Sequence, residues 1–234
     1  MALPKLNTLP TYEMTIPSSG KKVHYRPFLV KEEKAIMIAS ESGNNSDVFR
    51  ALVRTIADCI EEPIAEQALT SFDIEYAFLQ MRARSVGETA NIAFKCEKCE
   101  ASNPVEIKLD EVKIVIPDIE KTIKLTDEIS VEVDWPSFED VVRVGVDKAA
   151  DAESAFKLIA SCLRAVITEE ERINLRDSTD NELKEFIESM NSNQFAAIRD
   201  FIDQIPALNH NIDFTCKSCS HENKLKIEGL QNFL

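Results

Sequence analysis

The chain has 234 residues, 44% of them hydrophobic and only five of them glycine, which excludes a disordered polymer and suits two small cores. Its net charge of −14 divides into −3 on residues 1–115 and −11 on residues 116–234, a balance that disfavours binding to nucleic-acid phosphates. The apolar runs are too short to span a membrane, and the N-terminus lacks the pattern of a signal peptide. We therefore expect a reducing cytoplasmic setting.

The first half of the chain opens with a proline-containing arm and then alternates between strand and helix patterns. Alternating residues predict strands, and apolar residues spaced by three and four predict helices. The expected elements are an arm at 1–13, strands at 14–16 and 22–25, helices at about 30–41 and 46–61, a short helix at 63–68, and a helix from 71 that Gly87 ends. The basic residues before Gly87 suit the negative end of that last helix.

The second half contains the same kinds of pattern in a similar order. Ser137 with Asp140, and Thr168 with Glu171, have the spacing of helix capping boxes. The expected elements are strand-like segments at 112–116 and around 123, a strand at 130–134, helices at 137–148 and 152–167, a helix starting at 168, and helices at about 178–190 and 193–204.

A Cys-x-x-Cys motif occurs twice within a longer repeated pattern. The first copy carries Cys96 and Cys99, and the second carries Cys216 and Cys219. An Asn, an Ile and a Phe precede each pair, and an Asn and an Ile follow it at one fixed offset, so the copies align without a gap. Each copy alternates into and out of the cysteines, which predicts a β-hairpin with two thiols at its tip.

The repeat extends upstream of the cysteines. The strand at residues 22–25 and its following proline match the strand at 130–134, and apolar residues of the next helices match as well. We therefore predict an α+β fold built by tandem internal duplication, each half a β-hairpin, helices and a CxxC-tipped, zinc-ribbon-like hairpin. The predicted divisions are an arm at 1–13, a first repeat at 14–116 and a second repeat at 117–234.

Four cysteines at two hairpin tips have three interpretations. A single structural Zn²⁺ held by Cys96, Cys99, Cys216 and Cys219 matches the ligand number of a closed tetrahedral site. A thioredoxin-like redox pair is disfavoured because that chemistry places CxxC at a helix N-terminus. The third interpretation is four reduced cysteines that remain from a former metal site.

The other metal-binding or reactive side chains are scattered. His221 follows the second motif, but its counterpart in the first copy is Ala101, which argues against a ligand role. His24 and His210 stand alone, so no catalytic triad is indicated. Cys59 and Cys162 lie among apolar residues and are expected in the core.

Four stretches carry a resemblance to a known family: the string from Ile16 to Lys34, Asp73–Leu79, Arg82–Glu88 and the first CxxC. In them the chain resembles the T4-type bacteriophage baseplate protein family, which includes hub subunits and hub assembly proteins. The resemblance covers most of the chain and is strongest in its first half. It implies a viral structural or assembly role in the host cytoplasm during tail morphogenesis, with a final location either in the virion baseplate or outside it. It carries no known catalytic residue to this chain.

Two classes of function follow. The first is a non-enzymatic baseplate hub protein that binds other tail proteins, with a transient chaperone of the tape-measure or hub proteins as its variant. The second is a zinc-ribbon module that binds nucleic acid, which the acidic charge opposes. We expect partners among phage tail proteins, with neither nucleic acid nor membrane among them. The acidic second half serves either solubility or the docking of a basic partner segment.

Overall fold

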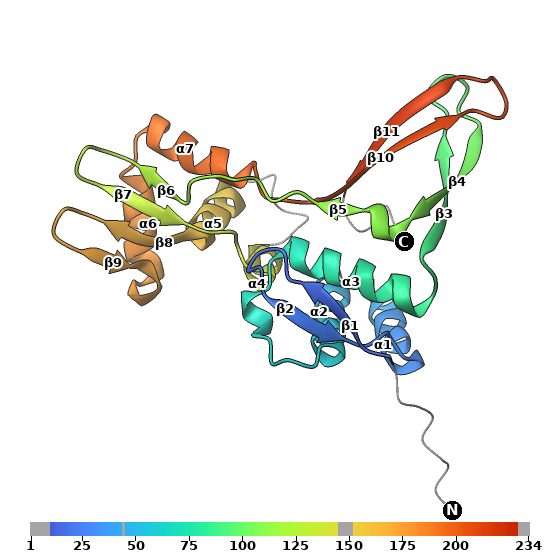
Figure 1. The fold of residues 1–234 in the computed structure, drawn as a ribbon. Helices are drawn as coiled ribbons and strands as arrows, with labels where there is room; N and C mark the ends of the chain where they lie inside the picture. Colours follow the sequence, from blue (N-terminus) through green and yellow to red (C-terminus); the bar gives the residue numbers. More distant parts are fainter. Residues whose placement is uncertain (1–9, 44, 145–151, 229–234) are drawn as a thin grey trace, which may run out of the picture. The chain divides into compact units, whose positions relative to one another are not determined.

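The computed structural model describes residues 10–43, 45–144 and 152–228, and these form a mixed α+β structure (Figure 1). The predicted α+β class is therefore confirmed. The chain divides into two compact units: unit 1 takes its residues from 1–66, 72–115 and 207–234, and unit 2 takes 67–71 and 116–206. The hairpin with the second CxxC belongs to unit 1, so the compact units differ from the sequence halves that we predicted to meet at 116 and 117.

Within its described residues, unit 1 contains α-helices and three small sheets. Its elements are β1 (Tyr12–Thr15), β2 (Lys22–Tyr25), α1 (Val30–Glu41), α2 (Asn45–Cys59), most of α3 (Ser71–Ser85), β3 (Thr89–Lys95), β4 (Ser102–Lys108), η2 (Leu109–Glu111), β5 (Lys113–Ile114), β10 (Leu208–Thr215) and β11 (Glu222–Glu228). Strands β1 and β2 form one hairpin, β3 and β4 a second, and β10 pairs with both β11 and β5. A short 3-10 helix, η1 (Glu66–Ala68), stands where we predicted a helix from 63 to 68.

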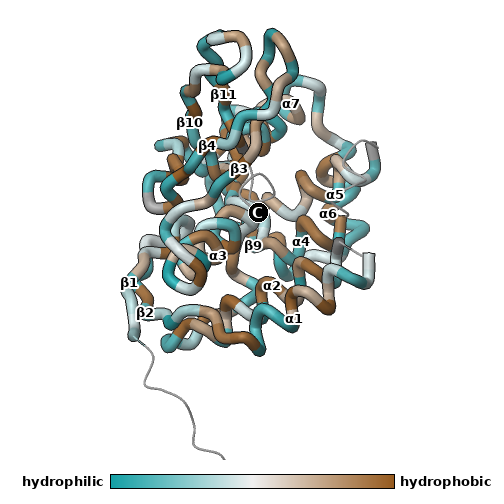
Figure 2. Tube along the Cα trace, turned by 90° about the vertical axis from the view of Figure 1, so that its right-hand side faces the viewer, coloured by the Kyte–Doolittle hydropathy of each residue, from teal (hydrophilic) through white to brown (hydrophobic). Residues whose placement is uncertain are grey.

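The core of unit 1 forms where the first hairpin, α2 and α3 meet. Val23 and Tyr25 alternate inward from β2, and Ile56 from α2 and Phe72 from α3 are fully buried with them. Helix α3 buries more than one face, which fits its position in the middle of the unit. Figure 2 shows hydrophobic and hydrophilic residues alternating along the hairpin strands, as period-two structure requires.

The turn of the first hairpin is attached to α3 by a buried carboxylate. Asp73 is fully buried and accepts hydrogen bonds from the backbone N–H of Ser18 at 2.8 Å and from its hydroxyl at 2.6 Å. Gly20 completes this turn with φ +67°, a conformation that side chains with a Cβ rarely adopt. The local sequence Ser-Ser-Gly therefore makes the turn, and a residue 55 positions away fixes it in space.

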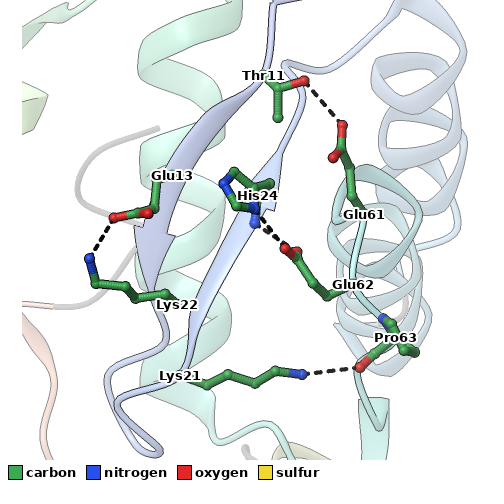
Figure 3. A network of polar contacts seen from close by, with 8 residues as sticks. All are labelled: Thr11, Glu13, Lys21, Lys22, His24, Glu61, Glu62 and Pro63. Atoms are coloured by element: carbon green, nitrogen blue, oxygen red, sulfur yellow. Dashed lines mark hydrogen bonds and ion pairs between the residues drawn. The ribbon is translucent and has the colours of Figure 1, made fainter.

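Polar contacts attach the same hairpin to the segment after α2 (Figure 3). Glu62 accepts from the backbone N–H of His24 at 2.7 Å, and its other oxygen lies 2.7 Å from Nδ1 of the His24 ring. Thr11 donates to Glu61 at 3.0 Å. The hydrogen bond and charge of Glu62 raise the pKa of His24 above its ordinary value.

Unit 2 is a four-stranded antiparallel sheet with helices. Its elements are β6 (Thr122–Lys124), β7 (Ser130–Val133), α4 (Phe138–Val144), α5 (Ala152–Cys162), β8 (Leu163–Ile167), β9 (Arg172–Asn174), η4 (Leu175–Asp177), α6 (Asp180–Glu188) and α7 (Ser192–Ile202). The strand order is β6-β7-β8-β9. Val131 and Val133 are buried with Leu163, and Trp135 stacks on Phe201 with ring centroids 4.5 Å apart.

Two predictions for unit 2 are wrong, and both concern residues 163–171. The predicted helix at 152–167 ends at Cys162, because Leu163–Ile167 pair with β7 as strand β8. Thr168 and Glu171 do make the side-chain contact of a capping box, at 3.1 Å, but they close the turn between β8 and β9. Cross-strand pairing outweighs the local helical spacing here, since Val166 and Ile167 also favour strands.

The remaining predicted helices agree with the structure within its described range. Ser137 and Asp140 form the predicted cap of α4, although residues 145–148 of the predicted helix lie outside the described residues. Residues 1–9 of the predicted arm lie outside them too, and Tyr12 with Glu13 belongs to β1 instead of the arm.

The two units repeat one local arrangement. In unit 1 the residue after β2, Arg26, donates its N–H to the carbonyl of Cys59 at the end of α2, at 2.9 Å. In unit 2 the residue after β7, Asp134, donates its N–H to the carbonyl of Cys162 at the end of α5, also at 2.9 Å. The hairpin therefore meets the end of the second helix in the same way in both units.

Candidate metal centre

Hairpins β3–β4 and β10–β11 carry the two CxxC motifs at their tips. In each, seven residue pairs lead to a tight turn, which begins at Cys96 in the first hairpin and at Cys216 in the second. The N–H of Cys96 donates to the carbonyl of Ala101, and that of Cys216 donates to the carbonyl of His221, at 2.9 and 2.8 Å. Residues Glu100 and Ser220 have φ of 56° and 55°, which turns the chain back at the same place in both.

The four cysteine sulfurs lie together between the two tips, which are side by side in Figure 1. All four lie within 4.8 Å of one another. Two short distances cross between the hairpins: Cys96 Sγ to Cys219 Sγ is 3.7 Å, and Cys99 Sγ to Cys216 Sγ is 3.6 Å. The two motifs, more than a hundred residues apart in the chain, therefore form one site.

The environment of the first cysteine in each motif favours its thiolate. Burial alone would raise the pKa of Cys96, but N–H groups of Cys99 and Lys98 that point at its sulfur lower it below the ordinary value. The same balance at Cys216, with N–H groups from Cys219 and Ser218, lowers its pKa to about 6. These sulfurs are ready to act as anionic ligands.

Cys99 behaves in the opposite way. An N–H from Ala101 favours its thiolate, but the neighbouring thiol of Cys219 and burial outweigh that hydrogen bond and raise the pKa of Cys99 to about 12. Four sulfurs so close together cannot all become anionic unless a cation lies among them. A bound metal ion supplies that charge and removes the thiol protons.

Two buried asparagines link the hairpins reciprocally. Asn103 of β4 accepts from the N–H of Lys217 at 2.9 Å, and Asn223 of β11 accepts from the N–H of Glu97 at 2.9 Å. Each asparagine is 1% exposed, and each donates its amide to the carbonyl two residues earlier in its own hairpin. The Asn103 amide also donates to Cys216 Sγ at 3.6 Å.

This pair of asparagines was missed as part of the site by sequence reasoning. Asn103 and Asn223 were counted only among the residues that align the two copies. Their identical offset from the cysteines was the available signal, although Asn91 and Asn211 recur at a fixed offset as well and are exposed. Phe94 and Phe214, which also recur, contact each other with ring centroids 6.4 Å apart.

The other sequence candidates lie outside the cluster. His221 contributes its backbone carbonyl to the turn of the second hairpin, and no atom of its ring is among the clustered ligands. Burial raises the pKa of Cys59 to about 11 and that of Cys162 to about 12, as expected for core thiols. No further cluster of metal-ligating side chains lies among the described residues.

The model of one family, described as T4 bacteriophage base plate protein, matches residues 9–234. The chain belongs to this family. The resemblance inferred from the sequence is thereby confirmed at family level, and the matched range includes both CxxC hairpins and the whole of unit 2. No curated protein and no solved structure matches the chain.

Membership in the base plate protein family gives the chain a structural role in the phage tail, with other tail or baseplate proteins as its partners. None of the helices among the described residues is long and apolar enough to cross a membrane. Both hairpins of the candidate metal centre belong to unit 1.

The donor set of this base plate protein suits Zn²⁺. Tetrahedral coordination with Zn–S bonds of about 2.3 Å separates neighbouring sulfurs by about 3.8 Å. The two cross-hairpin distances of 3.7 and 3.6 Å agree with that edge length. Thiolate ligands select zinc or iron–sulfur chemistry over magnesium and calcium, which prefer oxygen.

Proposed function

We propose that this base plate protein is a non-enzymatic structural or assembly protein of the baseplate hub, which acts by binding other tail proteins. The match of the base plate family model to nearly the whole chain carries the proposal. A site of four thiolates adds support, because it leaves a metal no open coordination position for water or substrate. The main variant is a chaperone that holds the tape-measure or hub proteins during assembly and leaves before the virion is complete.

A structural Zn²⁺ bound by Cys96, Cys99, Cys216 and Cys219 is the second part of the proposal. Its role would be to fasten hairpin β10–β11 to hairpin β3–β4. Because the ligands come together only in the folded state, metal binding free energy adds to the free energy of unfolding. The proposal is supported by the sulfur distances and by the asparagines that align the two tips.

We also infer that the chain arose by tandem duplication. The supporting observations are local and recur in pairs. Arg26 and Asp134 make equivalent backbone hydrogen bonds to Cys59 and Cys162. The asparagines exchange equivalent contacts between the two CxxC turns. An ancestor with a single copy, and therefore a single CxxC hairpin, would form this site as a homodimer. The symmetry of such a dimer would account for the equivalent hydrogen bonds that the two hairpins exchange.

Affinity capture of a tagged chain from infected cells, followed by mass spectrometry, tests the function. We expect hub or tape-measure proteins among the captured partners. Analysis of purified virions separates the two variants: a hub subunit remains in the particle, and a chaperone is absent from it. Capture of nucleic acid without tail proteins, in a manner that weakens steeply with salt, would contradict the proposal and favour the zinc-ribbon alternative.

A further inference from the structure

One pocket of unit 2 has a charge opposite to that of its surroundings. Unit 2 contains 10 Lys and Arg against 21 Asp and Glu, a net charge of −11. Four of those ten cations nevertheless line one pocket of about 470 Å³ beside the β6–β9 sheet, together with only two carboxylates. The lining cations are Lys121, Arg164, Arg172 and Arg176.

The sheet register explains why these residues converge. Thr122 pairs with Glu132, Glu132 with Ala165, and Ala165 with Asn174, so one row of side chains crosses all four strands on the same face. Three members of this row line the pocket, and the fourth, Ala165, is fully buried and has only a methyl group. A small side chain in the middle of the row leaves room between the larger ones.

A β-bulge directs Arg164 to this pocket. Glu132 pairs with Ala165 and the next residue, Val133, pairs with Leu163, so Arg164 is the extra residue of β8. Its guanidinium donates to the carbonyls of Ser161 at 2.5 Å and Trp135 at 2.9 Å. Bulges re-aim side chains and are frequent beside functional sites.

The ion pairs within the pocket leave two positive charges without a carboxylate. Arg172 donates to both oxygens of Glu132, and Lys121 lies 2.7 Å from Asp134, so both carboxylates of the pocket are already paired. Among the residues that the structure describes, the Arg164 guanidinium bonds to neutral carbonyls and to no carboxylate. Within the described part of the chain, the Arg176 side chain makes neither an ion pair nor a hydrogen bond, and it is exposed.

We propose that this pocket binds a pair of carboxylates on a short acidic segment of a partner protein. Guanidinium groups bind carboxylates through two parallel hydrogen bonds, and Arg164 is already held in place for such a contact. The negative charge around the pocket repels a long polyanion such as nucleic acid. Salt screens charges that lie more than about 8–10 Å apart, so the more distant carboxylates do not cancel the attraction between the pocket cations and a short acidic segment. The pocket volume lies in the range of small-ligand sites.

The inference rests on the proposed role in protein binding, and its test needs only purified full-length protein. Fluorescein-labelled hexaglutamate is titrated at low salt, with anisotropy as the readout, against wild type, Arg176→Gln, Arg164→Lys and Arg199→Gln. Arg199 is exposed in unit 2 outside the pocket, so its variant matches the charge change of Arg176→Gln. Circular dichroism melts confirm that each variant is folded.

We expect Arg176→Gln to weaken peptide binding about fivefold, as for a partly exposed ion pair. Arg164→Lys should weaken peptide binding about tenfold, because lysine keeps the positive charge but lacks the two parallel N–H donors of the guanidinium. Arg199→Gln should leave it unchanged. Absence of binding by wild type, or equal losses in Arg176→Gln and Arg199→Gln, would overturn the inference. Tighter binding of a 12-residue oligothymidylate that competes with the peptide would also overturn it. Each of these three outcomes leaves capture of tail proteins in infected cells unaffected, so it is distinguishable from failure of the proposed function.

Discussion

The reciprocal asparagines control how closely the two CxxC turns approach each other. Each one joins the turn of one hairpin to a backbone N–H of the other, and both are buried. Residues that orient metal ligands through hydrogen bonds change metal affinity by about 10–100-fold when they are lost. Asn103 and Asn223 should therefore matter to the site although neither contacts a metal.

We expect Asn103→Ala and Asn223→Ala each to weaken zinc binding by at least about tenfold. The alanine leaves a backbone N–H of Lys217 or Glu97 without its acceptor and removes an amide donor near a thiolate. Competition with a chromophoric zinc chelator measures the affinity. Asn91→Ala is the matched control, since Asn91 belongs to the same repeated motif but is exposed. Equal affinities of Asn103→Ala and Asn91→Ala would refute the role.

His24 should make unit 1 more stable in mild acid than in mild base. Its pKa is raised in the folded state by Glu62, so the folded protein binds the proton more tightly than the unfolded chain does. The resulting stabilisation is complete below the unfolded pKa of about 6.5 and is lost as pH rises through the higher folded pKa. The hydrogen bond to His24 also lowers the pKa of Glu62. The carboxylate therefore stays charged, and the contact persists, until the pH falls through that lowered pKa.

An NMR titration of the His24 ring measures the folded pKa directly. Urea denaturation at pH 5.5 and pH 8.5 should show that His24→Gln loses stability relative to wild type mainly at the lower pH. The single exposed contact involved predicts a small effect. A His24 ring that titrates at or below the ordinary histidine value would show that the pair with Glu62 does not persist in solution.

Among the elements, hairpin β1–β2 depends on α3 for its position. A two-stranded hairpin is marginal by itself, and the fully buried Asp73 carboxylate receives both polar hydrogens of Ser18 in its turn. Hydrogen bonds to charged groups are worth about 1.5–3 kcal/mol. The turn is therefore fixed by a contact that joins two distant elements.

Asp73→Ala should lower the free energy of unfolding by about 2–3 kcal/mol, because it leaves the half-buried N–H of Ser18 without its acceptor. Ser18→Ala is the graded control: it removes only the hydroxyl contact and should cost about 1 kcal/mol. Urea denaturation measures both values from the shift in midpoint. If the two variants are destabilised equally, the backbone hydrogen bond contributes little and the hydroxyl contact alone carries the effect of Asp73.

For the whole molecule, the proposed metal closes a very long loop. Cys99 and Cys216 are 117 positions apart, and nearly all of unit 2 lies between them. A link that closes a long loop removes much conformational entropy from the unfolded chain. Tryptophan and tyrosine fluorescence report on the two units separately, because the chain's only tryptophan is in unit 2 and all three tyrosines are in unit 1.

Zinc removal should destabilise unit 1 more than unit 2. We expect a chelator, or Cys99→Ser, to lower the tyrosine-detected thermal midpoint by about 10 °C or more, since a metal worth a few kcal/mol has this effect. The Trp135 fluorescence transition should shift less. The chelator should not lower the midpoint of Cys99→Ser any further. A chelator-insensitive wild type that contains no zinc by elemental analysis would remove the metal from the proposal.

The four thiols, the hairpins that carry them and most helices could be predicted from the sequence alone. These features depend on local patterns, and the ungapped alignment of Cys96 and Cys99 with Cys216 and Cys219 needs no tertiary information. Local pattern failed at Leu163–Ile167, whose apolar spacing suits a helix but whose backbone pairs with β7. Strand pairing is a non-local interaction, and the spacing of apolar residues within one segment does not identify the strand with which it pairs.

Which parts of the chain belong together became clear from the folded structure. It assigned hairpin β10–β11 to unit 1 and brought both cysteine pairs within 4.8 Å. It also gave Asn103 and Asn223 their hydrogen-bonding role and gathered four cations of an acidic unit at one pocket. Each of these depends on contacts between residues far apart in sequence, and such contacts are chosen by packing and by the satisfaction of buried polar groups, which no local pattern encodes.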